Sequence, residues 1–304
     1  MFLIETYLFI FTLKYLTYKY MTSQNTILQG LISFTPPNIY NLNNSVTIPS
    51  SVIDLPAGSI FNGNNYVISF NTYGLALFNI IGDLNNATVI NNLTVTSIGI
   101  FNEGGGGLLE SYSKNVILNN CIFNGDILQP QSGGLIGKKC SNVAIINSTF
   151  NGNINNNSGG ITGTKCSSIK IINTNVNGNI NGKYSGGFVG NSCKNIYIFN
   201  CIYTGNIEGK YSAGFVGSNS KKVKIINSIS NANKFNYSGG FCAAYSYNIK
   251  MINCTSTGII NKCTSSMLAC KCGKGGKYIK IIKCTYNLPI YTKLISYTNL
   301  TIKN

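Results

Sequence analysis

Short alternating runs of apolar and polar residues recur along the middle of this chain. Ile169-Lys170-Ile171 and Val223-Lys224-Ile225 are examples, and each places a lysine between two aliphatic residues. Alternation with a period of two, in short runs bounded by Gly, Asn and Ser, is typical of β-strands and excludes helices. No segment between these runs is long enough to supply a crossover helix. The pattern therefore predicts an all-β fold built from short strands.

The short runs belong to a longer repeat of 26 or 27 residues. A pair of small residues opens each copy, at Gly106-Gly107, Gly133-Gly134, Gly159-Gly160, Gly186-Gly187, Ala213-Gly214 and Gly239-Gly240. An asparagine follows the second glycine of each pair by 13 residues, at Asn120, Asn147, Asn173, Asn200, Asn227 and Asn253. A Cys, Ser or Thr follows each of these asparagines. Coincident positions in six copies indicate a repeat architecture.

Each copy is predicted to contain three short strands separated by corners, and the first is the apolar pair after the glycines, as in Phe188-Val189. Because so short a strand cannot bury its face alone, the copies are expected to stack, with about 4.8 Å between neighbouring layers. Identical positions then lie above one another, and the aliphatic columns form a continuous core. The predicted fold is a single parallel β-helix with 26–27 residues per coil. A leucine-rich repeat is disfavoured, because only one residue separates Ile171 from Asn173 and the remainder is too rich in Gly, Asn and Ser for a helix.

The asparagine column has a structural interpretation. A sharp corner between strands can need a left-handed backbone, which Asn tolerates better than any residue except Gly. Stacked amides can also hydrogen-bond along the helix axis, each donating to its neighbour. We therefore interpret the six asparagines as a structural ladder and not as a ligand site.

Two longer stretches resemble a known superfamily. The segments LPAGSIFNGNNYVISF (residues 55–70) and GLALFNIIGDLNNATVINNLTV (residues 74–95) look like the opening coils of the pectin-lyase-like right-handed parallel β-helices. The cores GGLIG (residues 133–137) and GGFVG (residues 186–190) resemble GLUG-type repeats. The resemblance spans roughly residues 50–288 and implies a right-handed coil. It implies no single chemistry, because the superfamily includes lyases, hydrolases, adhesins and viral surface proteins. The composition is also similar to that of giant-virus proteins, by analogy only.

These patterns divide the chain into four parts. Residues 1–20 form an apolar extension, 21–50 an N-terminal cap, 51–288 the β-helix and 289–304 a C-terminal cap. Glu5, Lys14 and Lys19 interrupt the extension, so it is too short and broken for a transmembrane helix. It also lacks the basic start and cleavage site of a signal peptide. Three alternatives stay open: a reading frame that begins at Met21, an uncleaved anchor, or a helix that caps the fold.

The charge of the chain narrows the class of partner. The chain has 304 residues, a formal net charge of +16 and no histidine, and all of its basic residues are lysines. Arginine provides the bidentate contacts to phosphate and guanine, so its absence argues against sequence-specific nucleic-acid recognition. Nonspecific attraction to polyanions stays open. A genome rich in A and T is the alternative source of the lysines.

The 11 cysteines do not follow the spacing of a disulfide framework. Most occupy repeat positions that other copies fill with Ser or Thr, so we expect small, reduced core residues. One such column stacks at a spacing that disulfides could bridge: Cys140, Cys166, Cys193, Ser220, Ser246 and Cys272. A zinc site from Cys263, Cys270, Cys272 and Cys284 is disfavoured, because the spacing fits no familiar motif. No metal and no cofactor is predicted.

Catalytic groups are scarce. The chain has 7 carboxylates, and the one conceivable cluster is Glu103, Glu110 and Asp126, on neighbouring coils but in different columns. The paired acids of glycosidases lie about 5–9.5 Å apart, and no adjacent acidic pair occurs here. Each of the three is interpreted as a solvated loop acid. The prediction therefore leans against an enzyme, and these three are the weak candidates if the chain is one.

Surface residues carry the remaining functional signal. The outward positions of the second predicted strand hold Lys170, Tyr197, Lys224, Lys250 and Lys280, one coil apart. A parallel stripe of Tyr184, Tyr211 and Tyr237 precedes the glycine pairs. Lysine beside tyrosine suits extended glycans or other polyanions, whereas the alternative is that the lysines only solubilise the strand.

The predicted function is that of a non-enzymatic structural or adhesive protein on a virion or cell surface, with glycans as ligands. The alternative is a divergent polysaccharide lyase or glycoside hydrolase of the pectin-lyase-like superfamily. A homo-oligomer is compatible with either function. Neither the ligand nor the location follows from the residues themselves.

Overall fold

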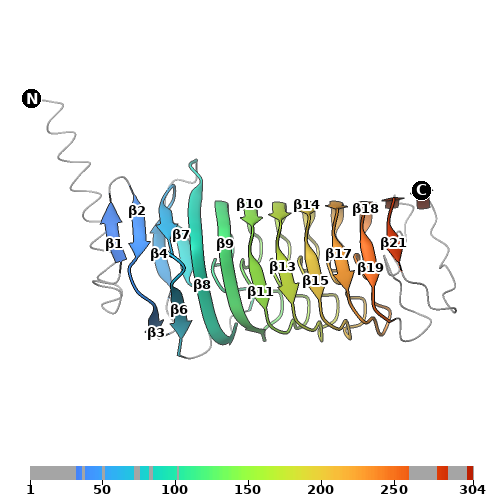
Figure 1. The fold of residues 1–304 in the computed structure, drawn as a ribbon, viewed down its shortest axis with the longest axis horizontal. Coiled ribbons are helices and arrows are strands. Elements are labelled where there is room, and N and C mark those ends of the chain that lie inside the picture. The colour runs from blue at the N-terminus through green and yellow to red at the C-terminus, as the bar shows by residue number, and fades with distance from the viewer. Residues whose placement is uncertain are drawn as a thin grey trace, which may run out of the picture.

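The computed structural model describes residues 32–35, 38–49, 52–71, 76–81, 85–100, 103–259, 279–286 and 300–303. In this part of the chain every regular element is a strand, and consecutive coils stack into an elongated right-handed parallel β-helix (Figure 1). The predicted fold class is therefore confirmed. No helix in the described ranges is long and apolar enough to cross a bilayer. The extension at residues 1–20 lies outside the described residues.

The N-terminal coils contain seven short strands: β1 (Ile32–Thr35), β2 (Ile39–Leu42), β3 (Val46–Ile48), β4 (Ile53–Pro56), β5 (Ile60–Asn62), β6 (Val67–Phe70) and β7 (Phe78–Ile81). β1 pairs with β2 in antiparallel fashion. From β2 onward the pairing is parallel, with β2 against β5 and β3 against β6. β4 and β7 form a separate two-stranded parallel sheet. The antiparallel β1 thus lies at the N-terminal end of the parallel stack.

The following coils are more regular. Two long strands come first, β8 (Thr88–Ile100) and β9 (Lys114–Ile127). Each later coil then contributes one six-residue strand, namely β10 (Ser141–Ile146), β12 (Ser167–Ile172), β14 (Lys194–Phe199), β16 (Lys221–Ile226) and β18 (Tyr247–Ile252). Each coil also contributes one three-residue strand, namely β11 (Thr149–Asn151), β13 (Asn175–Asn177), β15 (Ile202–Thr204), β17 (Ile229–Asn231) and β19 (Thr255–Thr257). The last strands are β20 (Ile279–Ile282), β21 (Thr285–Tyr286) and β22 (Leu300–Lys303).

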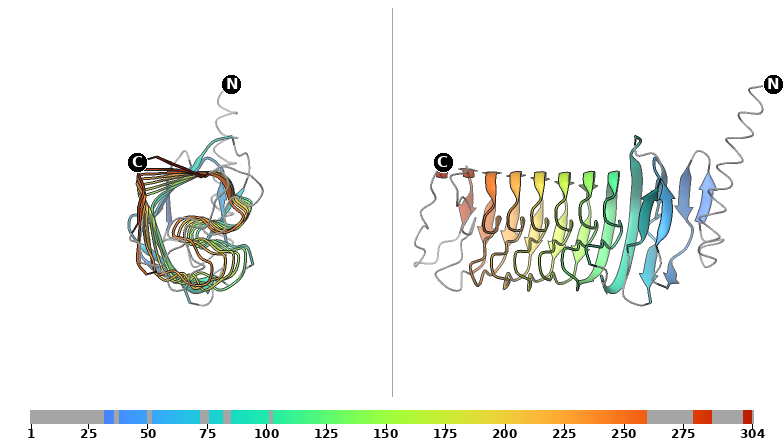
Figure 2. Two further views of the ribbon diagram at one scale, coloured as in Figure 1. Left: turned by 90° about the vertical axis from the view of Figure 1, so that its right-hand side faces the viewer. Right: turned by 180° about the vertical axis from the view of Figure 1, so that it is seen from behind.

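Two parallel stacks of strands therefore run along the regular coils, and we call each stack a sheet. We name the sheet of β10, β12, β14, β16, β18 and β20, with the first half of β9, the long-strand sheet. The sheet of β11, β13, β15, β17 and β19 is the short-strand sheet. The end-on view in Figure 2 shows the coils nearly superimposed. Equivalent positions pair without slippage, as in Ile145 with Ile171 and Ile171 with Ile198. These inward aliphatic residues are fully buried, and each contributes on the order of 1.5–3 kcal/mol.

The glycine pairs allow the chain to fold inward between the two sheets. In place of a full strand, the segment after each pair makes single bridges between coils, such as Val189 with Val216. Behind it Phe188 and Phe215 stack inside the core with ring centroids 4.6 Å apart. A Cβ on Gly187 would lie 2.0 Å from the carbonyl oxygen of Gly214 and 2.4 Å from the ring of Tyr203. The second glycine of each pair is therefore required by close packing.

The asparagine column lies at the corner between the two sheets. All six predicted members have positive φ, between 49° and 54°. Asn173 donates to Asn147 over 3.2 Å, and Asn200 donates to Asn173 over 2.9 Å. Asn253 donates to Asn227 over 3.2 Å. Asn147 instead donates to Asn119 in the neighbouring column, over 3.4 Å. The corner and the amide hydrogen bonds thus act together at these positions.

The described cysteines are free thiols, and all except Cys284 are buried. Cys193, for example, forms no disulfide, and its backbone N–H donates to Ser220 Oγ over 3.2 Å. Burial raises the pKa of Cys121 and Cys201 to about 12. Small polar side chains in these columns bond to the backbone of the neighbouring coil, which explains why Cys, Ser and Thr replace one another. Cys263, Cys270 and Cys272, which complete the disfavoured zinc set, lie outside the described residues.

Candidate functional site

The outward side of the long-strand sheet carries one aligned side chain from each coil. Lys170, Tyr197, Lys224, Lys250 and Lys280 come from β12, β14, β16, β18 and β20 and pair in direct succession. Parallel pairing in register places neighbouring members about 4.8 Å apart along the axis. Lys170, Lys224 and Lys280 are exposed, and the other two are partly exposed. We name these five residues the basic row. They are five of the eight residues that the sequence predicted for ligand binding, and they lie in one line.

The same line is apolar toward the N-terminus. In successive coils it holds Ile39, Ile60, Val89, Ile117 and Ala144, and Ala144 pairs directly with Lys170. Ile60 is 36% exposed. We name these five residues the apolar row. The outward line therefore changes from aliphatic to cationic between β10 and β12.

The adjacent outward line changes in the opposite sense. Its N-terminal members Asn41, Asn62, Asn91 and Asn119 form a hydrogen-bonded row, with Asn62 donating to Asn41 over 2.8 Å and Asn91 donating to Asn62 over 3.2 Å. Its C-terminal members are half-buried apolar residues, namely Ile146, Ile172, Phe199, Ile226, Ile252 and Ile282. We name this second part the aliphatic row. A flat cationic row beside an aliphatic row makes the C-terminal half of this face amphipathic.

The C-terminal half of this face carries positive charge and no negative charge on its strands. The strands β12, β14, β16, β18 and β20 contain no acidic residue. Lys224 Nζ lies 5.6 Å from the centre of the Tyr197 ring, and Lys221 Nζ lies 5.8 Å from that of Tyr247. These cation–π contacts stabilise the ammonium groups of Lys221 and Lys224, but they leave the positive charge of the face without a counter-charge. Like charges placed directly opposite each other on paired strands are destabilising. Lys224, Lys250 and Lys280 follow one another in this way over three coils.

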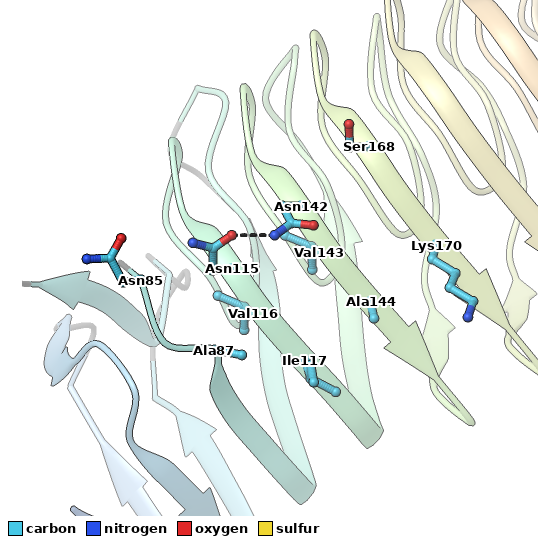
Figure 3. Close-up of a pocket in the computed structure, with 10 residues that line it drawn as sticks. All are labelled: Asn85, Ala87, Asn115, Val116, Ile117, Asn142, Val143, Ala144, Ser168 and Lys170. Atoms are coloured by element: carbon cyan, nitrogen blue, oxygen red, sulfur yellow. Dashed lines mark hydrogen bonds between the residues drawn. The ribbon is translucent and has the colours of Figure 1, made fainter. Parts of the chain in front are cut away.

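A pocket of about 510 Å³ lies where the apolar row meets the basic row (Figure 3). One side is polar and holds Asn85, Asn115, Asn142 and Ser168. The other side is made by Ile117, Ala144 and Lys170 of the outward line, and Val116 and Val143 lie between the two sides. Ala87 directly precedes Thr88, which pairs with Val116, so it occupies the coil position of Asn115 on the first side. Figure 3 shows the polar residues at the strand starts and Ile117, Ala144 and Lys170 along the neighbouring line. Asn142 donates a hydrogen bond to Asn115.

The predicted tyrosine stripe has a different geometry from a stacking platform. The rings of Tyr184 and Tyr211 stack on each other with centroids 5.6 Å apart, and Tyr237 follows at 5.8 Å. Lys210 Nζ lies 5.0 Å from the Tyr211 ring centre and 5.4 Å from that of Tyr237. All three tyrosines have φ of 60° or 61°. Their ring faces therefore point mainly along the axis toward one another, which leaves edges and hydroxyl groups for a ligand.

The three candidate acids are each engaged separately. Glu103 accepts a hydrogen bond from Gln131 Nε2 over 2.6 Å. Glu110 accepts from the backbone N–H of Ser111 over 2.8 Å. Asp126 accepts from the backbone N–H of Asn153 over 2.7 Å. Within the described residues no three of the Asp, Glu and Cys side chains gather as metal ligands. The acids thus act as acceptors at separate corners.

The structure contains a buried lysine, Lys234, that the sequence did not indicate as a candidate. Lys234 is fully buried and pairs with Ile207 in the inward column that also holds Ile127, Ile154 and Ile180. Its Nζ donates to the carbonyl oxygens of Ala232 and Thr257, each over 2.5 Å. Burial lowers its pKa to about 8. The signal in the sequence was a lysine at a position where the four preceding copies carry isoleucine.

No family model matches the chain, and no curated protein sequence gives a significant match. Matches among solved structures have low similarity to the chain. The surface adhesin PfbA of Streptococcus pneumoniae is 13% identical with a TM-score of 0.38, over 86% of this chain and 91% of that one. The pectate lyase Pel9A is 12% identical with a TM-score of 0.36, over 87% and 70%. QnrB1, a plasmid-mediated fluoroquinolone resistance protein, is 11% identical with a TM-score of 0.30, over 69% and 83%. At this distance no chemistry transfers to the present chain.

Proposed function

We propose that the protein is a non-enzymatic adhesive β-helix whose basic row and aliphatic row bind an extended acidic glycan. The glycan chain runs parallel to the helix axis. Its carboxylate or sulfate groups meet the lysine ammonium groups, and the apolar faces of its sugar rings cover the aliphatic row. Display on a virion or cell surface is part of the proposal and follows the sequence resemblance to β-helix surface proteins.

The observation that carries the proposal is the succession of lysines in the basic row. Lys224, Lys250 and Lys280 are direct neighbours on paired strands, and their sheet face holds no carboxylate. Such an arrangement costs stability through repulsion. An anionic ligand that lies along the row would relieve this cost in every coil. Solubility alone would be served equally well by lysines that alternate between columns.

The chemistry of the face favours a glycan over other polyanions. The face offers ammonium groups, and lysine binds anions as a compact point charge without the planar fork that arginine offers to phosphate. A pyranose ring combines hydroxyl groups at its edge with an apolar face, which matches a cationic row beside Phe199 and Ile226. The repeat along an extended acidic polysaccharide is also comparable with the spacing of the coils, about 4.8 Å.

The non-enzymatic part of the proposal is supported by the separate positions of the acids. Glu103, Glu110 and Asp126 are each held by a different hydrogen-bond donor at a different corner. None of them is part of the basic row. A lyase or hydrolase remains the alternative, and it predicts that bound polysaccharide is cleaved.

The experiment compares two variants with the same change in net charge. In the row variant Lys170, Lys224, Lys250 and Lys280 become glutamine. In the control variant four exposed lysines at corners become glutamine, namely Lys139, Lys165, Lys183 and Lys210. Binding to immobilised polygalacturonate and to heparin is measured at low salt, and reducing ends released from polygalacturonate are assayed in parallel. We expect the row variant to lose about tenfold or more in affinity and the control less than about threefold.

Equal losses in the two variants would mean that net charge alone attracts the glycan, and the proposed face would be wrong. Release of new reducing ends by the wild-type protein would overturn the non-enzymatic part. Vesicles of phosphatidylserine and phosphatidylcholine form a third arm. Binding to these vesicles without binding to either glycan would identify an anionic membrane as the partner and overturn the glycan.

A further inference from the structure

We infer that the pocket between the apolar row and the basic row is an end-binding subsite for a single acidic sugar unit. This inference rests on the proposed function and deepens it. The basic row alone would hold any stretch of an acidic chain. The pocket would instead fix where the chain ends and in which direction it runs along the helix.

The polar side of the pocket is preformed by the backbone. Asn115, Asn142 and Ser168 are the second residues of β9, β10 and β12, and their φ angles of 55°, 54° and 56° form a corner at the start of each strand. These left-handed corners hold the three side chains in line on one side of the pocket. Amide and hydroxyl groups in such a line can donate to and accept from the hydroxyl groups of a sugar ring.

The opposite side is open because one of its side chains is small. Ala144 stands in the outward line at the position that Lys170 and Tyr197 fill in the next two coils. Ala87, which is exposed and short, leaves further room on the polar side, one coil before Asn115. Ile117 adds an apolar surface on which the face of a sugar ring can lie. The pocket thus lies beside the small side chain of Ala144, directly before the first lysine of the basic row.

Charge and size select the kind of occupant. Lys170 is the only charged residue among the ten that line the pocket. A volume of about 510 Å³ falls within the range of small-ligand sites and suits a mono- or disaccharide. A uronic acid or a sulfated sugar satisfies both conditions, since its anion can meet Lys170 while its ring lies against Ile117 and Ala144. The rest of the chain would then continue over Tyr197 and Lys224.

The test uses galacturonate oligomers of one to six units with wild-type protein and three variants. Ala144→Phe fills the pocket and leaves every charge in place. Asn142→Gly removes one amide from the pocket at a position where glycine keeps the left-handed corner. Thr204→Phe is the matched control, because Thr204 is an exposed outward residue of the short-strand sheet. Galactose and galactose 6-sulfate are measured as neutral and sulfated single units by ligand-observed NMR.

We expect Ala144→Phe to abolish binding of the mono- and disaccharide while the hexamer loses less than about tenfold, and Thr204→Phe to change neither. Asn142→Gly should weaken the short ligands in the same sense without loss of thermal stability. Undiminished binding of short ligands by Ala144→Phe would overturn the pocket, and so would an equal loss for short and long ligands. If Ala144→Phe bound the short ligands as well as the wild-type protein does, and hexamer binding still depended on the basic row, the pocket would be wrong and the proposed function would stand. Failure of all oligomers to bind wild-type protein would overturn both, and binding of galactose as strong as galacturonate would overturn the acidic specificity.

Discussion

A single buried lysine shows what a charged side chain costs at an inward position of the coil. Lys234 occupies a column of isoleucines, where its ammonium group has no carboxylate beside it and donates to two backbone carbonyls. The pKa falls to about 8 from an ordinary value of 10.5 because burial penalises the charged form. A shift of this size corresponds to a cost on the order of 3 kcal/mol for the charged form. The residue is therefore tolerated by the fold and not favoured by it.

The first prediction concerns the pH dependence of Lys234→Ile. In the wild-type protein the folded-state pKa lies below the unfolded value, so the unfolded state binds more protons between pH 8 and pH 10.5. Stability contributed by this residue is therefore lowest below pH 8 and rises as the pH increases through that window. We expect the stability advantage of the isoleucine variant to shrink by about 3 kcal/mol between pH 7 and pH 10.5.

Urea unfolding at pH 7, 8, 9 and 10.5 measures this difference. Subtracting the wild-type curve from the variant curve cancels the titration of the other lysines and tyrosines. Lys224→Ile, at an exposed position, provides the control, and its difference should vary by less than about 0.5 kcal/mol. A pH-independent difference for Lys234→Ile would show that the residue is neutral or solvated throughout.

Corners are the elements that make the repeat possible, and the asparagine corner combines two contributions. Asn200 has a φ of 54°, and its amide donates to Asn173 over 2.9 Å. A left-handed backbone costs an alanine about 1–2 kcal/mol, whereas glycine adopts it freely. The amide hydrogen bond adds about 0.5–1.5 kcal/mol. The backbone and the side chain thus contribute comparable amounts.

The second prediction separates these two contributions. Asn200→Ala should lower the free energy of unfolding by about 2–3 kcal/mol, because it loses the hydrogen bond and strains the corner. Asn200→Gly should lower it by only about 1 kcal/mol, because glycine keeps the corner and loses the hydrogen bond. Chemical denaturation of both variants measures the gap. If alanine and glycine proved equal, the left-handed corner would contribute nothing to stability.

At the scale of elements, the repeated columns of the sequence predicted the stacking well. Six asparagines at one spacing identify a corner, because they recur in every copy. Alternation such as Ile169-Lys170-Ile171 identifies an inward and an outward side, although the outward residue is a lysine only in some coils. The inward fold after the glycine pair was predicted as a strand, since two apolar residues after Gly186-Gly187 look alike in either conformation. The left-handed tyrosines were also unforeseen. Tyr184 has no intrinsic preference for positive φ, and only the neighbouring coils impose it.

The candidate site was predictable in part for the same reason. The basic row lies on an outward position that recurs at a fixed spacing, so the sequence alone aligned Lys170 with Lys224. The pocket depends on what is missing in one coil, namely a large side chain at Ala144. A small residue in a single copy carries no signal until its neighbours in space are known.

At the scale of the whole molecule, the two sheets of the regular coils differ in charge over the described strands. The short-strand sheet has two outward positions on each of β11, β13, β15, β17 and β19, and none of these strands contains a charged residue. The outward line of the long-strand sheet carries four lysines over five coils. A codon bias acts on both sheets alike and would have placed lysines on both. The uneven distribution is therefore an argument for the proposed binding role of the basic row.

The third prediction follows from this concentration of charge. A dense polyanion such as heparin releases condensed counterions as lysines engage it, so the logarithm of the association constant falls linearly with the logarithm of the salt concentration. Four lysines of the basic row predict a slope of about −3 for the wild-type protein. The variant with Lys170, Lys224, Lys250 and Lys280 changed to glutamine should give a slope near zero, whereas the corner-lysine variant should keep most of it.

The slopes are obtained by titrating heparin fragments at several salt concentrations. If both variants lost the slope equally, the binding would report the net charge of +16 and no particular face, and the row would then be only a solubilising surface.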